Sequence, residues 1–234
     1  MSVDNIKFFL SSEQECNYLP GEQSASIFAD PEGIMTTEIY SILINHGFRR
    51  SADYVYRPHC PQCQECKSAR IPVEQFKPTR SQKRVIKKNS FLSIQETTPH
   101  LSEEHFELYK KYMKQRHKDG EMDHNDPDRY FDFLNSAWCD TKFIEFRLNE
   151  KLISVAVVDF LRDGLSALYT FFDPKHSQLS PGTFAVLWQI QRAIQLDKKY
   201  VYLGYWIKDC EKMNYKINFK PLEILDQDQW HLHF

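Results

Sequence analysis

The clearest hydrophobic pattern in the chain lies in its second half and predicts a run of strands. Residues 142–148 largely alternate between apolar and polar side chains, and residues 151–161 form a nearly continuous apolar run. An Asn-Glu pair separates these two segments, and an Arg-Asp-Gly turn at 162–164 leads to a third apolar segment at 165–172. Short apolar segments joined by tight turns are typical of an antiparallel meander.

Helical patterns lie on both sides of this meander. Ser102 before two glutamates, and Asp126 before Pro127, are typical helix starts and predict two helices ahead of it. Behind it, residues 183–196 carry apolar side chains on one face and predict a crossover helix, and residues 200–204 predict a further strand. This order of elements is that of acetyltransferase-like (GNAT) domains, although other α+β domains share it.

The first part of the chain is predicted to mix short strands and helices. Strands are expected at 53–57 and 69–73, on either side of a cysteine-rich loop, and a short helix at 80–89. Together these patterns predict an α+β protein with two domains. Residues 1–98 would form a basic, cysteine-containing α/β domain, and residues 99–234 a GNAT-like domain with a mixed sheet.

Charge is distributed unevenly and suggests a polyanionic partner. The whole chain has a formal net charge of −2, but residues 57–89 hold nine basic residues against two acidic ones, a local charge of +7. In the helix predicted at 80–89 the cations recur at helical spacing and would share one face; they are Arg80, Lys83, Arg84, Lys87 and Lys88. Such a face would bind a nucleic-acid backbone without reading its bases, or it would only be solvated, and charge alone favours neither.

Three of the six cysteines lie close together at Cys60, Cys63 and Cys66, a spacing that favours a metal site. Thiolates suit zinc or an iron–sulfur cluster. Cys16 is the better candidate for a fourth ligand, since His59 is adjacent to Cys60 and would not easily share one ion with it. A packed cluster of reduced thiols and a redox-sensing site are the alternatives.

No targeting or membrane segment is visible in the sequence. The first residues lack an apolar segment behind a basic start, and no apolar run approaches the roughly 18 residues that a membrane span needs. We therefore expect a cytoplasmic protein without a membrane partner, in which thiols stay reduced.

The loop before the predicted crossover helix is a candidate anion site. It reads Leu-Ser-Pro-Gly-Thr, and exposed backbone N–H groups at a helix start bind anions. Ser180, Gly182 and Thr183 are therefore candidates to hold an acyl donor. The alternative is an ordinary helix start, with Ser180 as its cap and Pro181 at its first position.

An aromatic segment that ends in cations is a further candidate. Residues 200–207 read Tyr-Val-Tyr-Leu-Gly-Tyr-Trp-Ile, and Lys212 and Lys216 follow them. Such rings could stack on a base or an adenosine, or they could form a buried edge of the core. Tyr205 and Trp206 lie just past the predicted strand and are the better candidates for a site.

Taken in order, these motifs resemble the aminoacyl-tRNA–protein transferases of the N-degron pathway, which include an arginyl type and a shorter bacterial leucyl type. The matching positions are 16–20, 47–51, 54, 56–58, 60, 66, 70–71, 78–84, 169, 172–174, 179–182, 202–207, 210, 212–213, 215–216, 219, 221 and 223. Tyr-Leu-Pro follows Cys16, where the arginyl type resembles Cys-x-x-Cys, so the chain looks most like the leucyl branch. Because that second cysteine is missing, the resemblance does not decide whether this chain has the metal or cluster site of the arginyl type.

The resemblance implies transfer of leucine from Leu-tRNA to the α-amino group of proteins that begin with Asp or Glu, which marks them for degradation. The acceptor amine is the nucleophile, so the protein needs none of its own, and no cofactor is required for the transfer, although zinc or an iron–sulfur cluster could still bind the cysteines. The cations of the basic helix, with Lys212 and Lys216, would bind the tRNA or the acidic N-terminus. Asp173 and Tyr205 are candidates to relay a proton to the departing ribose oxygen.

Other functions stay open at this point. Arg-tRNA could replace Leu-tRNA as the donor, and a non-catalytic, zinc-dependent RNA-binding module would explain the cysteines and the cationic face. A small-molecule acetyltransferase using acetyl-CoA would share the order of elements. Its usual Arg/Gln-x-x-Gly-x-Gly/Ala loop is absent here, where residues 178–183 read Gln-Leu-Ser-Pro-Gly-Thr.

Overall fold

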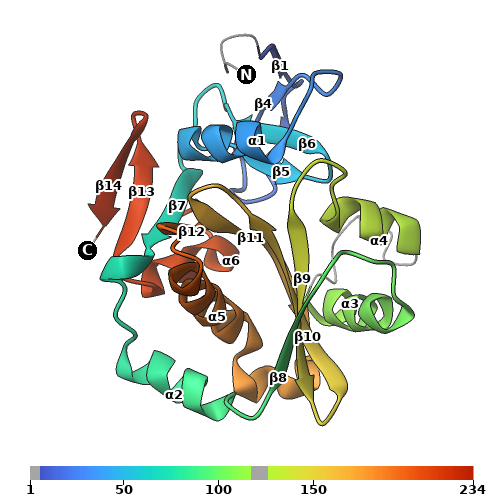
Figure 1. The fold of residues 1–234 in the computed structure, drawn as a ribbon. Coiled ribbons are helices and arrows are strands. Elements are labelled where there is room, and N and C mark those ends of the chain that lie inside the picture. Colours follow the sequence, from blue (N-terminus) through green and yellow to red (C-terminus); the bar gives the residue numbers. More distant parts are fainter. Residues whose placement is uncertain (1–5, 117–125, 234) are drawn as a thin grey trace.

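The computed structural model describes residues 6–116 and 126–233, and within these ranges the strands form sheets of eight, four and two strands (Figure 1). The large sheet has the order β14-β13-β7-β12-β11-β10-β9-β8. In that order its strands are Gln229–His233, Leu222–Asp226, Lys67–Pro72, Tyr200–Trp206, Gly164–Phe172, Lys151–Phe160, Thr141–Leu148 and Ser93–Thr97. Neighbours are antiparallel except β11 and β12, which are parallel.

Helices cover both faces of the large sheet (Figure 1). The helices α5 (Pro181–Gln195) and α2 (Arg80–Lys88) pack on one face, and α3 (Glu103–Arg116) and α4 (Pro127–Leu134) pack on the other. Alternate residues of β10 serve both cores, since Ala156 belongs to the cluster with α5 while Val155 and Val157 belong to the cluster with α3 and α4. Burial on both faces explains why this strand is apolar almost throughout.

The N-terminal part forms a smaller unit at one end of the large sheet (Figure 1). Its four-stranded sheet has the order β1-β4-β6-β5, with strands Phe8–Leu10, Ser26–Ala29, Tyr54–Pro58 and Arg49–Ser51. Strands β2 (Gln14–Glu15) and β3 (Gln23–Ser24) form the two-stranded sheet, and helix α1 (Thr37–Leu43) precedes β5. Tyr40 of α1 shares a third core with Leu161 and Tyr202 at the end of the large sheet.

The predicted order of elements in the second half is confirmed. Two helices precede the meander β9-β10-β11, and α5 crosses over to β12, which lies parallel to β11. The start of α4 is also as predicted, because Asp126 Oδ1 accepts hydrogen bonds from the backbone N–H groups of Asp128 and Arg129 at 3.0 and 3.1 Å. None of the helices in the described residues combines the length and the apolar character that a membrane crossing requires.

The mixed α/β character predicted for the chain is confirmed, with a large mixed sheet. Strand β7, from the first 98 residues, lies between β12 and β13 inside that sheet. The two predicted domains therefore share a sheet, and a division between residues 98 and 99 stays a prediction.

The parallel strands β11 and β12 meet only at their first residues and then part. Their pairs are Gly164 with Tyr200, Leu165 with Val201, and Ser166 with Tyr202. A Cβ atom at Gly164 would lie 2.6 Å from the carbonyl oxygen of Tyr200, so only glycine permits this close approach. Further along, β11 pairs with β10 and β12 pairs with β7, so the two parallel strands no longer pair with each other.

Candidate active site

An arginine from the N-terminal sheet lies where β11 and β12 part. Arg49, on β5, donates hydrogen bonds from Nη1 to Ser166 Oγ at 3.0 Å and from Nη2 to the carbonyl oxygen of Ala167 at 2.7 Å. On the side of β12, Gly204 interrupts the strand with a positive φ of 82°, and an added Cβ there would lie 3.6 Å from Arg49 Nε. The guanidinium group is thus held between the two strands, with the residue only 6% exposed.

A second buried cation lies beside this arginine. Lys216 belongs to a 3₁₀ helix, Tyr215–Asn218, and is 3% exposed. Its Nζ atom donates a long hydrogen bond of 3.4 Å to the carbonyl oxygen of Met213 and lies 4.7 Å from the centre of the Tyr215 ring. Burial first, and then the charge of Arg49, lower the pKa of Lys216 to about 7. The two cations are therefore close enough to repel each other.

Within residues 6–116 and 126–233, neither Arg49 nor Lys216 forms an ion pair. The adjacent Arg50, by contrast, is paired with the buried Asp159 at 2.6 Å. The tyrosines that interact electrostatically with Arg49 are neutral at physiological pH, because burial raises their pKa values; they are Tyr40, Tyr56 and Tyr205. Because buried charge without a partner is costly, this site favours an anionic ligand.

The loop before α5 leaves the start of that helix open. Ser180 stands at the cap position with a left-handed backbone (φ 54°, ψ 54°), but its side chain makes no capping hydrogen bond. A Cβ atom at Gly182 would meet no atom within 4 Å. The N–H groups of Gly182 and Thr183 belong to the first turn, where a helix offers no acceptor. Ser180 and Pro181 therefore occupy the cap and the first helical position of the ordinary helix start, but the Ser180 side chain leaves the first-turn N–H groups uncapped.

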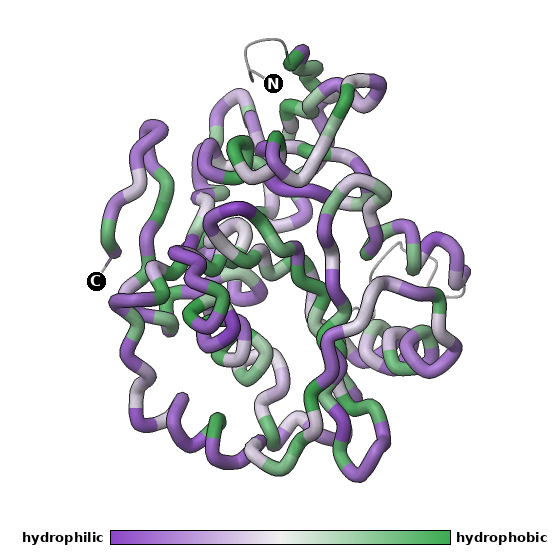
Figure 2. The backbone as a smooth tube through the Cα atoms, viewed as in Figure 1, coloured by the Kyte–Doolittle hydropathy of each residue, from purple (hydrophilic) through white to green (hydrophobic). Residues whose placement is uncertain are grey.

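The basic helix α2 reaches from the segment that carries Lys216 to this loop. Near its start, Gln82 Nε2 donates to the carbonyl oxygen of Asn218 at 3.0 Å, and just past its end Asn89 Nδ2 donates to that of Leu179 at 2.9 Å. All five predicted cations of α2 are exposed, and Figure 2 shows the helix as largely hydrophilic. The predicted helix and its cationic face are confirmed, while its ligand stays a prediction.

Comparison with known proteins identifies the family. The models "Arginine-tRNA-protein transferase, C terminus" and "Arginine-tRNA-protein transferase, N terminus" match residues 104–226 and 14–84. An aspartate/glutamate leucyltransferase of Pseudomonas fluorescens strain Pf-5 is 47% identical over 225 residues, which cover 96% of each chain. One of Pseudomonas aeruginosa strain LESB58 is 45% identical over the same lengths. The chain belongs to the arginine-tRNA-protein transferase family. It is an acyltransferase that uses aminoacyl-tRNA.

The fold of the transferase also occurs in another protein of known structure. The crystal structure of FemX is 8% identical in sequence, with a TM-score of 0.50, and the match covers 90% of this chain and 82% of that chain. At this identity the likeness establishes a shared fold.

The two predicted proton-relay residues of the transferase lie at the ends of the parting strands. The carboxylate of Asp173 accepts a hydrogen bond from the backbone N–H of Lys175 at 2.9 Å and caps a 3₁₀ helix, Pro174–Leu179. The Tyr205 hydroxyl donates to the carbonyl oxygen of Gly47 at 3.0 Å, and burial raises its pKa well above the ordinary value. Both groups hold the fold in place, share no hydrogen bond with each other, and stay predictions as proton relays.

The predicted metal ligands of the transferase lie in one neighbourhood. Burial, and then the neighbouring Cys60, Cys16 and Cys63, raise the pKa of Cys66 to about 12. Among the described residues, however, no three cysteine sulfurs lie within 4.8 Å of one another. Tetrahedral zinc with Zn–S bonds of about 2.3 Å would place its sulfurs about 3.8 Å apart. The cysteines as placed do not form such a set, and zinc or a cluster there stays a prediction.

A buried polar network not predicted from the sequence holds α3 against β9. His105 Nε2 lies 2.9 Å from Glu145 Oε1, and His100 brings a third possible ligand atom within 4.8 Å of both. Arg147 pairs with Glu145 at 2.6 Å and with Glu104 at 2.8 Å. Arg147 balances the charge of Glu145, while His105 Nδ1 is buried without a hydrogen-bond partner among the described residues.

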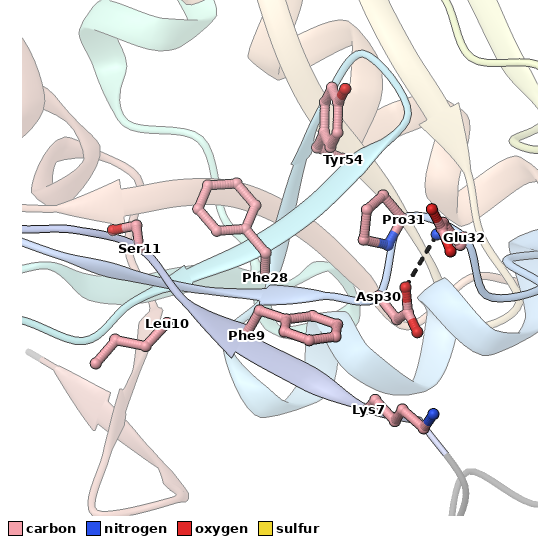
Figure 3. Close-up of a pocket in the computed structure, with 9 residues that line it drawn as sticks. All are labelled: Lys7, Phe9, Leu10, Ser11, Phe28, Asp30, Pro31, Glu32 and Tyr54. Carbon is pink, nitrogen blue, oxygen red and sulfur yellow. Dashed lines mark hydrogen bonds between the residues drawn. The ribbon is translucent and has the colours of Figure 1, made fainter.

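A groove of about 720 Å³ lies on the N-terminal sheet (Figure 3). Phe9, Phe28 and Tyr54 give it an apolar surface, and the Asp30 carboxylate at its rim accepts a hydrogen bond from the backbone N–H of Glu32 at 3.0 Å. None of its lining residues is a predicted site residue of the transferase.

Sequence patterns did not single out Arg49, although it lies within the matching motif at 47–51. Adjacent arginines on a short strand point to opposite sides, and only the fold shows that Arg50 meets a carboxylate while Arg49 does not. Lys212 and Lys216 were predicted together, but Lys212 is exposed on α6 (Glu211–Asn214) and Lys216 is buried. The signal available in the sequence was the position of these residues within the family motifs.

Proposed function

We propose that this transferase moves leucine from Leu-tRNA to the α-amino group of proteins whose first residue is Asp or Glu, and so marks them for degradation. Relatives at 47% and 45% identity carry the name aspartate/glutamate leucyltransferase. The observation that carries the proposal is the Arg49–Lys216 pair, two buried cations without an ion pair among the described residues. An acidic side chain would supply the negative charge that this site lacks, and a neutral side chain would not.

The tRNA is assigned to α2, whose exposed cations run between the Lys216 segment and the loop before α5. Backbone phosphates would release counterions from this face, which gives salt-dependent binding. The aminoacyl end would then lie at the start of α5, where the Ser180 side chain caps none of the first-turn N–H groups, which include those of Gly182 and Thr183. This arrangement assigns the second half of the chain to the acetyltransferase-like architecture, with the donor at the parting of β11 and β12.

In the proposed reaction, the acceptor nitrogen attacks the carbonyl carbon of the leucyl ester. The carbon–oxygen bond to the ribose breaks, a peptide bond forms, and the ribose oxygen takes up a proton. Free N–H groups near the carbonyl would stabilise the oxyanion, and one such donor is worth roughly a hundred- to a thousandfold in rate. Positioning of the two substrates supplies much of the rest. No cofactor takes part, and since the donor is an aminoacyl-tRNA the enzyme would work in the cytoplasm.

The test is a transfer assay with four peptides that differ only in their first residue, Asp, Glu, Asn or Ala. Each is incubated with labelled Leu-tRNA and, in a parallel series, with labelled Arg-tRNA. Leucine is expected on the Asp and Glu peptides alone. A preference for Arg-tRNA on the same peptides would change the donor. Equal labelling of all four peptides, or tRNA binding without any product, would rule the proposal out.

A further inference from the structure

The two cations of the site differ in one chemical respect. The guanidinium of Arg49 keeps its proton at any physiological pH, whereas the amine of Lys216 can release one. Lys216 is also the less firmly held of the two, since its Nζ atom makes only a 3.4 Å hydrogen bond to Met213 O and a 3.6 Å contact to Met213 Sδ. Its three donor positions are therefore not filled by strong acceptors of the protein.

The groups that face Lys216 come from several elements. Arg49 lies on β5, Cys210 is the residue just before α6, and Tyr215 belongs to the same 3₁₀ helix as Lys216. Among the described residues no carboxylate is paired with it. Burial and the positive charge of Arg49 both favour the neutral amine, and they lower its pKa to about 7. A free lysine near neutral pH would be fully charged.

We propose that Lys216 takes the proton from the α-ammonium group of the acceptor, and that the acidic side chain of the same acceptor enables it to do so. This inference rests on the proposed function and adds a catalytic role at the same site. The carboxylate of the acceptor enters beside Arg49 and Lys216 and brings the negative charge that a charged Lys216 needs. One proton then moves from the α-nitrogen to Nζ, so the total charge is unchanged. The α-nitrogen gains the lone pair with which it attacks the leucyl ester.

This coupling makes recognition and activation one event. With an Asn or Ala peptide, proton transfer would place a second uncompensated cation next to Arg49, so the α-amine would stay protonated at neutral pH. The acceptor's first residue is therefore expected to affect kcat as well as KM. Since an α-amino group has a reference pKa of about 7.7–8.0, it loses its proton unaided at higher pH, where Lys216 is no longer needed.

The test compares pH profiles of Lys216→Arg and wild type with the Asp peptide. Arginine keeps a positive charge for the carboxylate but cannot accept a proton. We expect KM within about threefold of wild type, and kcat at pH 7 lower by about six- to elevenfold, because only about a tenth to a sixth of an α-amine with a pKa of about 7.7–8.0 is unprotonated there. The kcat of the variant should rise with pH as this amine loses its proton and approach wild type near pH 9. Lys220→Gln, which removes an exposed lysine from the same segment, is the matched control and should leave the profile unchanged.

A second variant guards against a folding defect. Lys216→Gln should show the same recovery at high pH, but with a raised KM because the cation is also lost. A constant ratio of variant to wild-type kcat at all pH values, in both variants, would overturn the proposal and leave Lys216 a structural residue. Failure of the proposed function itself would look different, because wild type would then form no leucyl product with the Asp peptide at any pH.

Discussion

Replacement of Arg49 by Gln tests whether the buried arginine selects the acidic acceptor. The quantity to measure is the ratio of kcat/KM for an Asp peptide to that for the matching Asn peptide. Arg49 is 6% exposed, so a carboxylate bound to it would be largely shielded from water. Removing one partner of such a buried charge pair costs about 2–5 kcal/mol. Lys216 remains as a second cation, so the lower part of that range, about 2–3 kcal/mol, applies.

At about 1.4 kcal/mol for each factor of ten, the Asp-to-Asn ratio of the Gln variant should fall by about 30- to 150-fold. The same substitution also removes the hydrogen bonds to Ser166 Oγ and to the carbonyl oxygen of Ala167. That loss costs about 1–3 kcal/mol of folding free energy, but it affects both peptides equally and cancels in the ratio.

The assay is a competition between the two peptides for labelled Leu-tRNA, with both products quantified. Arg49→Lys is the matched control, because it keeps the charge and loses the planar pair of donors. It should retain most of the preference for Asp. If the Gln variant lost activity on both peptides equally, so that the ratio stayed at the wild-type value, Arg49 would only hold β11 and β12 together and the reasoning would be refuted.

Three further predictions concern stability and RNA binding. Because the folded-state pKa of Lys216 is lowered to about 7, the unfolded chain binds more protons than the folded chain above that pH, and wild type gains stability as the pH rises. A Lys216→Met variant should therefore be more stable than wild type by a constant free energy of unfolding below pH 7, and this difference should shrink by up to about 1.4 kcal/mol per pH unit above it. Urea denaturation measures the difference, and a value that does not change with pH would contradict the prediction. Arg50→Met leaves Asp159 buried without its partner and should lower the free energy of unfolding by about 3–5 kcal/mol in the same assay. The Asp-to-Asn ratio of kcat/KM should not change. A loss below about 1 kcal/mol would contradict the stabilising role of the buried ion pair. A third variant replaces four exposed cations of α2 by Gln, namely Lys83, Arg84, Lys87 and Lys88. It should bind tRNA more weakly, and the magnitude of the slope of log K against log salt should fall by about 3. An unchanged slope would mean that the face is only solvated.

Periodicity predicted the elements of the second half because each of them is a local pattern. The continuous apolar run of β10 reflects burial on two faces, and the spacing of cations in α2 reflects one exposed helix face. Gly164 shows the limit of such patterns, since it looked like a hairpin residue. Its close approach to the backbone of Tyr200 became visible only when β12 was placed beside β11.

The site itself could be predicted only in part, because its charge balance depends on contacts between distant segments. Arg49 donates to Ala167, 118 residues away, and no local pattern records that contact. Lys216 was a candidate from the sequence. Its burial beside Arg49 depends on β5, the residue before α6 and the 3₁₀ helix of Lys216 folding together. Asp173 and Tyr205 were chosen for their chemical groups, and the fold uses both groups in hydrogen bonds of its own.

The central claim is that the acidic side chain of the acceptor binds between Arg49 and Lys216, and a crystal structure of the transferase with a peptide that begins with Asp tests it most directly. We expect the Asp carboxylate to lie within about 2.7–2.9 Å of a guanidinium nitrogen of Arg49 and of Lys216 Nζ. A carboxylate bound instead to the exposed cations of α2, with Arg49 and Lys216 untouched, would contradict it.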